Sequence, residues 1–157
     1  MPAEENLRNL SISLPVPAAP VANYLPFVIS GPLLFVSGQL AFGPSGKLDK
    51  AHTGKLGAEI SLAAGQAAAR LCAINVLAQA KAALGDLDKI LRCIRLGGFI
   101  NAAPGFSNLA VVMNGASDFM FEVFGEMGRH TRSTVGVAEL PLDSAVEIEA
   151  LFEIGPT

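Results

Sequence analysis

Two alternating segments near the C-terminus place the strongest constraint on how this chain folds. Residues 132–140 and 145–153 alternate apolar with polar or small side chains, contain several Val and Ile residues, and are separated by Pro141–Asp143. A period of two with β-branched residues is typical of a strand that covers a core with one face. We therefore expect two neighbouring strands joined by a turn at Pro141–Asp143.

Charged side chains occupy one face of each expected strand. One face of the first strand carries Arg132, Thr134, Gly136 and Ala138, and the second strand places Glu147 and Glu149 opposite Val146, Ile148, Ala150 and Phe152. Arginine suits bidentate recognition of a carboxylate, and a carboxylate in the same pocket could activate a water molecule. The alternative is an ordinary cross-strand ion pair on a solvated face. The sequence thus indicates that the chemistry lies where the cation meets the carboxylates.

The balance of apolar and charged residues predicts an oligomer. Of the 157 residues, 51% are hydrophobic and only 16% are charged, which is too few charges to cover a monomer comfortably. The length suits a single domain. The net charge of −3 and a pI of about 5.3 leave no basic track, which argues against nucleic-acid binding.

Targeting and redox features indicate a cytoplasmic protein. The N-terminus MPAEENLRNL is acidic and has no apolar signal core. Residues 56–84 are the longest apolar-rich stretch, but polar residues interrupt it, so we expect no membrane span and no membrane partner. Cys72 and Cys93 lie in apolar segments and are expected to be buried thiols rather than a disulfide.

The order of the remaining elements predicts an α+β fold. A short helical lead-in and an extended proline-rich segment precede the first strands, and Ser37-Gly38-Gln39 within the second strand predicts a bulge or a close approach to a ligand. The expected strands span Tyr24–Ile29, Leu33–Phe42 and Ile90–Phe99, and the expected helices span Leu56–Leu84 and Leu109–Met127. Helices covering one face of a mixed sheet account for this order.

Common catalytic signatures are absent from the sequence. GPSGK lacks the spacing of a P-loop, Val36-Ser37-Gly38 is not a nucleophile elbow, and His52 and His130 are too far apart in sequence for metal-ligand spacing. His130 is interpreted as a helix-end or surface residue, Tyr24 as a buried tyrosine with a bonded hydroxyl, and Ser37 as a strand hydroxyl bonded to the backbone. Phe119, Phe121 and Phe124 are expected to pack in the core.

The motifs resemble those of a known family, in the same order. Arg132 to Ala150 reads as R-S-x-V-x-V-A-x-L-P-x-x-x-x-V-E-I-E-A, Val36–Gln39 supplies V-S-G-Q, and Ala22-Asn23-Tyr24 loosely matches a G-P-Y segment. In these features the chain resembles the YjgF/Rid family, the reactive-intermediate enamine/imine deaminases, which are also called L-PSP endoribonucleases. The resemblance runs from about residue 20 to the end, so we expect one domain over residues 1–157 with residues 1–20 as an N-terminal extension.

The resemblance implies a fold, an assembly and a site. It implies a chorismate-mutase-like mixed sheet backed by two helices, assembled as a homotrimer with pockets between subunits. Arg132 would bind the substrate carboxylate, and Glu147 would act on the hydrolytic water. The positions expected to line the pocket are Tyr24, Ser37, Gly38, Asn114 and Thr134. The implied substrate is a small carboxylate or imine, and the implied reaction is hydrolysis to a 2-oxo acid and ammonia without metal or organic cofactor.

The chain also departs from its deaminating relatives. Thr134 stands where they carry cysteine and Gly136 where they carry glutamate, and the segment 101–128 looks longer than theirs. These differences indicate a divergent branch of the family. They keep two alternatives open, a protein of the same family that binds a 2-oxo acid without turnover and, with less support because there is no basic track, an endoribonuclease.

Overall fold

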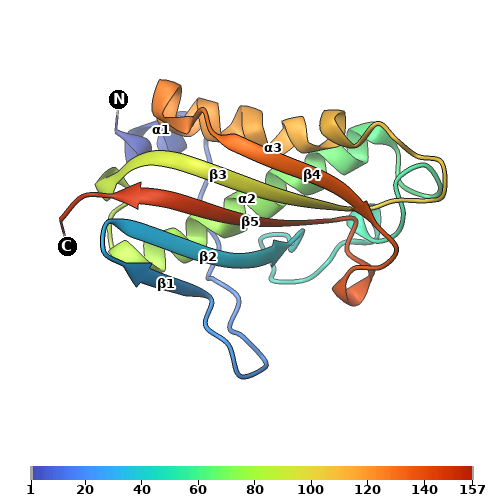
Figure 1. Cartoon of the computed structure of the whole chain (residues 1–157), viewed down its shortest axis with the longest axis horizontal. Coiled ribbons are helices and arrows are strands. Elements are labelled where there is room, and N and C mark those ends of the chain that lie inside the picture. Colours follow the sequence, from blue (N-terminus) through green and yellow to red (C-terminus); the bar gives the residue numbers. More distant parts are fainter. Residues whose placement is uncertain (1, 157) are drawn as a thin grey trace.

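Residues 2–156, the part of the chain that this computed structural model describes, fold into a five-stranded sheet with helices on one face (Figure 1). The sheet order is β1-β2-β5-β3-β4, in which β3 and β4 are parallel and the other pairs are antiparallel. The strands are β1 (Phe27–Ser30), β2 (Leu33–Leu40), β3 (Ile90–Asn101), β4 (Thr131–Val137) and β5 (Val146–Ile154). The helices are α1 (Ala3–Asn9), α2 (Leu62–Leu84) and α3 (Leu109–Phe124), and the 3-10 turns are η1 (Lys50–His52), η2 (Leu87–Lys89), η3 (Gly125–Gly128) and η4 (Pro141–Asp143).

The predicted α+β class is confirmed, but the pairing of the last two strands is wrong. β4 and β5 both form and η4 makes the turn between them, yet β3 lies between them and pairs with each. The β3–α3–β4 connection is a crossover through a helix, which makes β4 parallel to β3. That crossover places β4 at the sheet edge, and the chain then returns to form β5 in the interior.

Local sequence signals explain where the long helices begin and end. α2 starts at Leu62 rather than at Leu56, because the Ser61 hydroxyl caps the helix by accepting the N–H of Ala64 at 3.1 Å. Gly85 ends it in the left-handed conformation with φ of 75°. α3 ends at Phe124, and η3 continues the segment that was expected to be helical to Met127.

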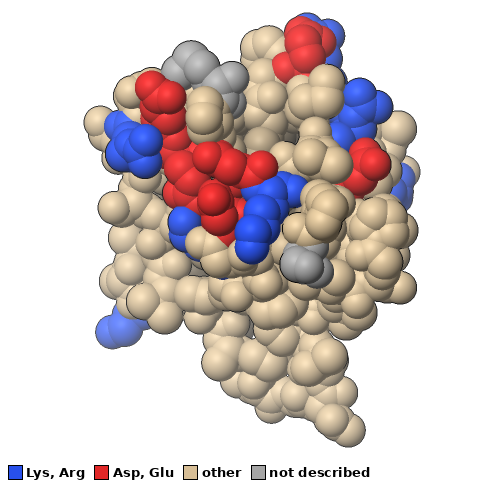
Figure 2. All heavy atoms as spheres, turned by 90° about the vertical axis from the view of Figure 1, so that its left-hand side faces the viewer, with Lys and Arg blue, Asp and Glu red and all other residues tan. Residues whose placement is uncertain are grey.

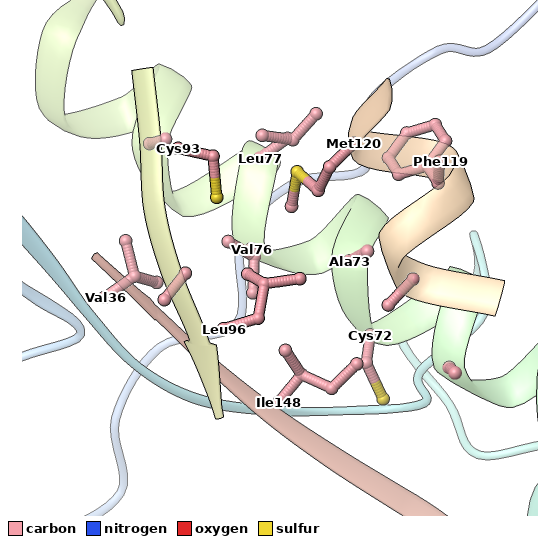
Figure 3. Close-up of a cluster of buried hydrophobic side chains, with 14 of the residues drawn as sticks. Val36, Cys72, Ala73, Val76, Leu77, Cys93, Leu96, Phe119, Met120 and Ile148 are labelled. Atoms are coloured by element: carbon pink, nitrogen blue, oxygen red, sulfur yellow. The ribbon is translucent and has the colours of Figure 1, made fainter. Parts of the chain in front are cut away.

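The core lies between the sheet and the two long helices. Figure 3 shows Leu77 of α2 and Met120 of α3 in one buried cluster with Leu96 and Ile148 of the sheet. Both cysteines are buried there as free thiols, as expected. α2 is long and apolar enough to span a membrane, but 61% of its most apolar window is buried within the fold. It is the core helix.

The opposite face of the sheet and the proline-rich segment leave apolar surface exposed. Val28, Phe35 and Val135 project from this open face with 45%, 44% and 47% exposure, and Val21 in the segment 15–26 is almost fully exposed. No Lys, Arg, Asp, Glu or His occurs between residues 9 and 46. In Figure 1 the segment 15–26 projects away from the domain, and the corresponding downward projection in Figure 2 shows no charged residue.

Candidate functional site

Three acceptors on α3 hold the side chain of Arg132. Its Nη1 donates to Asn114 Oδ1 at 3.0 Å and to Ser117 Oγ at 3.1 Å, and its Nη2 donates to the Ala110 carbonyl at 3.3 Å. Residues at these spacings share one face of a helix. The crossover brings that face over β4, where Arg132 pairs with buried Leu96 and therefore points to the helix side of the sheet. The fold thus places a guanidinium at the sheet edge, held by neutral groups.

Arg132 retains donors and charge for a ligand. A guanidinium has five N–H groups, and the three bonds to α3 leave the Nε–H and one N–H of Nη2. Within residues 2–156, Arg132 forms no ion pair, whereas Arg129 pairs with Glu126 at 3.3 Å and Arg70 with Glu122 at 2.9 Å. The two remaining donors suit one carboxylate.

Arg132 lines a hollow of about 650 Å³ between α3 and the start of β4. The lining residues are Asn114, Ser117, Asp118, Phe121, Glu122, Arg129, His130 and Arg132. His130 is half-buried there, with Nδ1 2.6 Å from the Gly128 carbonyl and Nε2 2.9 Å from Ser117 Oγ. Burial lowers the pKa of His130, the Gly128 carbonyl opposes that change, and the charge of Arg132 lowers the pKa further.

Glu147 does not reach this hollow within one chain, which corrects the expectation that it lies on the strand next to Arg132. β5 buries Val146 and Ile148 under the helices, so Glu147 projects from the open face. Two strand positions and the thickness of the sheet thus separate the two side chains, and no cross-strand ion pair forms between them. Burial, and then the neighbouring charge of Glu149, raise the pKa of Glu147 above its ordinary value of 4.5.

The predicted bulge in β2 lies against Glu147. The register between β2 and β5 shifts between Val36 and Gln39, and a side chain at Gly38 would lie 2.9 Å from Glu147 Cδ. The Ser37 hydroxyl donates to the Leu25 carbonyl at 2.6 Å, which confirms the expected backbone bond. Glycine at position 38 therefore leaves the space that the carboxylate occupies.

Two other predicted site residues lie near these groups. Thr134 follows Arg132 on the helix side of β4, and its Oγ1 is buried without a hydrogen-bond partner within residues 2–156. Tyr24 is 53% exposed just before β1, so the expectation of a buried tyrosine is wrong for the single chain.

Among the phenylalanines, Phe119 is fully buried and Phe124 packs partly, but Phe121 is 44% exposed and lines the hollow instead of the core.

Ser117 and His130 are site residues that the sequence did not identify. His130 was expected at a surface or helix end, but Ser117 links it to Arg132. Polar Asn114 and Ser117, three residues apart and therefore on one face of the helix, were the available signal. No group of three or more His, Cys, Asp or Glu residues with metal-binding geometry occurs within residues 2–156.

The predicted residues thus form two separate groups in one subunit. The first, which we call the arginine half-site, contains Arg132, Asn114 and Thr134 at the β4 edge. The second, the glutamate half-site, contains Glu147 and Gly38 on the open face, with Ser37 and Tyr24 nearby in the chain. One group can bind an anion and the other can act as a base, but only a second chain could bring them together.

Comparison with known proteins decides the family. The profile described as "YjgF/chorismate_mutase-like, putative endoribonuclease" matches residues 4–154. The chain belongs to the YjgF family. Protein TCP17 of Trypanosoma cruzi is 50% identical to this YjgF-family chain over 150 residues, which are 95% of this chain and 92% of TCP17.

Solved structures of YjgF-family relatives share the fold. Atu1372 of Agrobacterium tumefaciens, described as a protein of unknown function, is 51% identical with a TM-score of 0.89, over 98% of this chain and 92% of that one. TdcF of E. coli, solved with bound serine, is 26% identical with a TM-score of 0.62, over 92% of this chain and 97% of TdcF. The chorismate-mutase-like fold is therefore confirmed, with α1 as a third helix packed on α3.

Proposed function

We propose that this YjgF-family protein hydrolyses small enamine or imine intermediates derived from amino acids to 2-oxo acids and ammonia, as a cytoplasmic homotrimer. The observation that carries the proposal is the Arg132 guanidinium, which lines the hollow, keeps two N–H donors unused and forms no ion pair within residues 2–156. The bound serine of the relative TdcF, a small amino acid, supports a ligand of this size. The unpaired thiols of Cys72 and Cys93 suit a reducing compartment.

The proposed pocket joins the arginine half-site of one copy to the glutamate half-site of its neighbour. Two features support this. The half-sites lie on opposite sides of one sheet, and the open face carries exposed apolar residues such as Phe35 and Val28, which association would cover. A cyclic arrangement then gives each copy one complete pocket.

The proposed reaction needs positioning more than strong activation. Arg132 binds the carboxylate and so fixes the C=N carbon relative to a water molecule. Glu147 accepts a proton from that water as the oxygen adds to carbon and the C=N π bond breaks, and it returns the proton to the nitrogen, which gives a carbinolamine. The carbinolamine hydroxyl then loses its proton to form the carbonyl, while the C–N bond breaks and the nitrogen takes up that proton and leaves as ammonia. Burial and Glu149 raise the pKa of Glu147, which makes its carboxylate a stronger base than an exposed glutamate. Neighbouring pocket positions are Tyr24, Ser37, Gly38, Asn114 and Thr134.

The rate of ammonia release from 2-aminoacrylate, generated enzymatically in the same cuvette, tests the proposal. The wild-type protein is expected to accelerate release above the spontaneous rate. Arg132→Ala should lose about 100-fold or more of kcat/KM, because two charge-assisted hydrogen bonds disappear. Arg129→Gln is the matched control, since Arg129 lines the same hollow but is paired with Glu126. Equal rates with and without the wild-type protein, across several imines, would contradict turnover.

The second candidate is a protein that binds a small 2-oxo acid in the same pocket without turnover. Thr134 and Gly136 favour it, because they differ from the deaminating members. A melting temperature that rises with 2-oxobutanoate, in a protein that does not release ammonia, would select this function. A ribonuclease has the least support, because the net charge is −3 and no basic track is present.

A further inference from the structure

The Arg132 guanidinium is connected to a histidine through one hydroxyl group. Ser117 Oγ lies 3.1 Å from Arg132 Nη1 and 2.9 Å from His130 Nε2. The Gly128 carbonyl lies 2.6 Å from His130 Nδ1 and only accepts hydrogen bonds, so Nδ1 carries a proton. In neutral His130, Nε2 therefore accepts the Ser117 hydroxyl proton, while the Ser117 oxygen accepts from Arg132.

This arrangement survives when His130 gains a proton. A serine oxygen can accept two hydrogen bonds, so Ser117 can accept from the imidazolium Nε2–H and from Arg132 at the same time. The bridge then joins two cations instead of one. Because the bridge persists, the main effect of protonation on the site is an added positive charge close to Arg132.

We propose that His130 is a positioning residue of the arginine half-site: through Ser117 it holds the Arg132 guanidinium, and its protonation state couples carboxylate affinity to pH. The inference rests on the proposed carboxylate ligand for its second half only. A carboxylate bound to Arg132 would offset the arginine charge that opposes protonation of His130. Ligand binding and proton uptake by His130 then favour each other, so the affinity rises as the pH falls.

Other charged groups around His130 are accounted for. From α3, Asp118 and Glu122 line the same hollow; from η3 and its end, Glu126 and Arg129 lie nearby. Glu122 is paired with Arg70 and Glu126 with Arg129. Asp118 forms no ion pair within residues 2–156, so Asp118→Asn serves as a control for its contribution to the pH dependence.

Histidine ring NMR tests the link without any ligand. The chain has two histidines, so two ring signals are expected, and His52→Gln assigns them. Arg132→Gln removes the adjacent positive charge, which lowers the pKa of His130, and should therefore raise that pKa measurably. The ring signal of His52, which lies in η1, serves as the internal reference. An identical His130 titration in wild type and Arg132→Gln would overturn the inference.

Calorimetric titration with 2-oxobutanoate at pH 5.5 and pH 8 tests the coupling to the ligand. We expect about 3- to 10-fold tighter binding at pH 5.5, because proton uptake by His130 and ligand binding favour each other. The glutamine of His130→Gln does not titrate, so this variant should lose the tighter binding at pH 5.5. Ser117→Ala should weaken binding by about fivefold at both pH values. His52→Gln and Asp118→Asn should keep the wild-type gain.

These experiments distinguish failure of the proposed function from failure of the coupling through His130. If no small carboxylate binds at either pH, the proposed function is wrong, and the NMR comparison alone then decides the link between His130 and Arg132. If 2-oxobutanoate binds but His130→Gln keeps the full pH-dependent gain, the ligand proposal stands and the coupling through His130 is overturned. Thermal melts of each variant identify any that have lost the fold.

Discussion

At the residue scale, two glycines leave the space that the carboxylates of Glu147 and Glu149 occupy. A methyl group at Gly38 would lie 2.9 Å from Glu147 Cδ, and one at Gly97 would lie 2.7 Å from Glu149 Oε1. In both cases the neighbour is the flexible end of a side chain, so an added methyl group displaces the carboxylate more easily than the backbone. Substituting Gly38 and Gly97 one at a time therefore separates the contribution of the Glu147 carboxylate from that of Glu149.

Gly38→Ala is expected to lower kcat for ammonia release by about 10- to 100-fold, because a displacement of about 1 Å at a catalytic group has effects of this size. Gly97→Ala is the matched control and should keep kcat within about threefold, since it moves only Glu149. Steady-state kinetics on both variants measure the difference. Equal losses in the two would argue against a specific role for Glu147.

The raised pKa of Glu147 predicts a pH-dependent cost in stability. Because its folded-state pKa is higher than in the unfolded chain, the folded protein disfavours the ionised form. The cost is absent at low pH, where the group is protonated in both states, and is complete once the pH exceeds the raised value. Glu147→Gln should therefore be more stable than wild type in urea unfolding at pH 7, with a smaller gain at pH 4. A gain that does not change with pH would contradict this account.

At the element scale, α3 determines the position of the arginine half-site. Asn114 faces Arg132, while the next residue, Gly115, faces α2, where an added Cβ would lie 2.1 Å from the Gln66 carbonyl oxygen. The close approach of the helices at Gly115 therefore fixes the depth of α3 over the sheet. The site geometry depends on a helix–helix contact that carries no chemistry of its own.

Gly115→Ala is expected to destabilise the protein by about 3 kcal/mol, at the upper end of overpacking costs, because backbone rather than a flexible side chain must move. Gly136→Ala is the control: its nearest neighbours would lie 3.4 Å away, and the cost should be below about 1 kcal/mol. Urea unfolding monitored by circular dichroism measures both. A similar midpoint for Gly115→Ala and wild type would show that the helices can separate freely.

The sequence predicted the individual strands and helices better than it predicted which strands lie next to each other. The alternation in residues 132–140 and 145–153 correctly indicated two strands and which residues of each strand share a face, because a period of two is a local property. The expectation that Arg132 meets Glu147 on one face was wrong, since the two side chains lie on opposite sides of the sheet. Their pairing was wrong because insertion of β3 between them depends on the crossover, which is a long-range property. Ser117 and His130 were missed for the same reason, since only tertiary structure brings α3 to Arg132.

At the scale of the whole molecule, the distribution of apolar surface predicts self-association. The uncharged residues 9–46 include the projecting segment and β1 and β2, and the open face exposes Phe35. One chain holds its two half-sites on opposite sides of the sheet, so in the proposed pocket assembly and function should be lost together. The family resemblance, rather than any single motif, supplied the expectation of three copies.

Light scattering after size exclusion is expected to give three times the 16.2 kDa mass of one chain. Phe35→Glu places a charge on the open face and should dissociate the assembly and abolish ammonia release. Ala63→Glu adds the same charge to the exposed first turn of α2, where a carboxylate is tolerated, and should leave the mass unchanged. A Phe35→Glu monomer with full activity would contradict a pocket shared between copies.

The most direct test of the account is the dissociation constant of 2-oxobutanoate for wild type, Arg132→Gln and Arg129→Gln, measured by calorimetry at one pH. Wild type is expected to bind, Arg132→Gln to bind about 100-fold more weakly or not at all, and Arg129→Gln to stay within about threefold of wild type. Equal affinity of wild type and Arg132→Gln would contradict it.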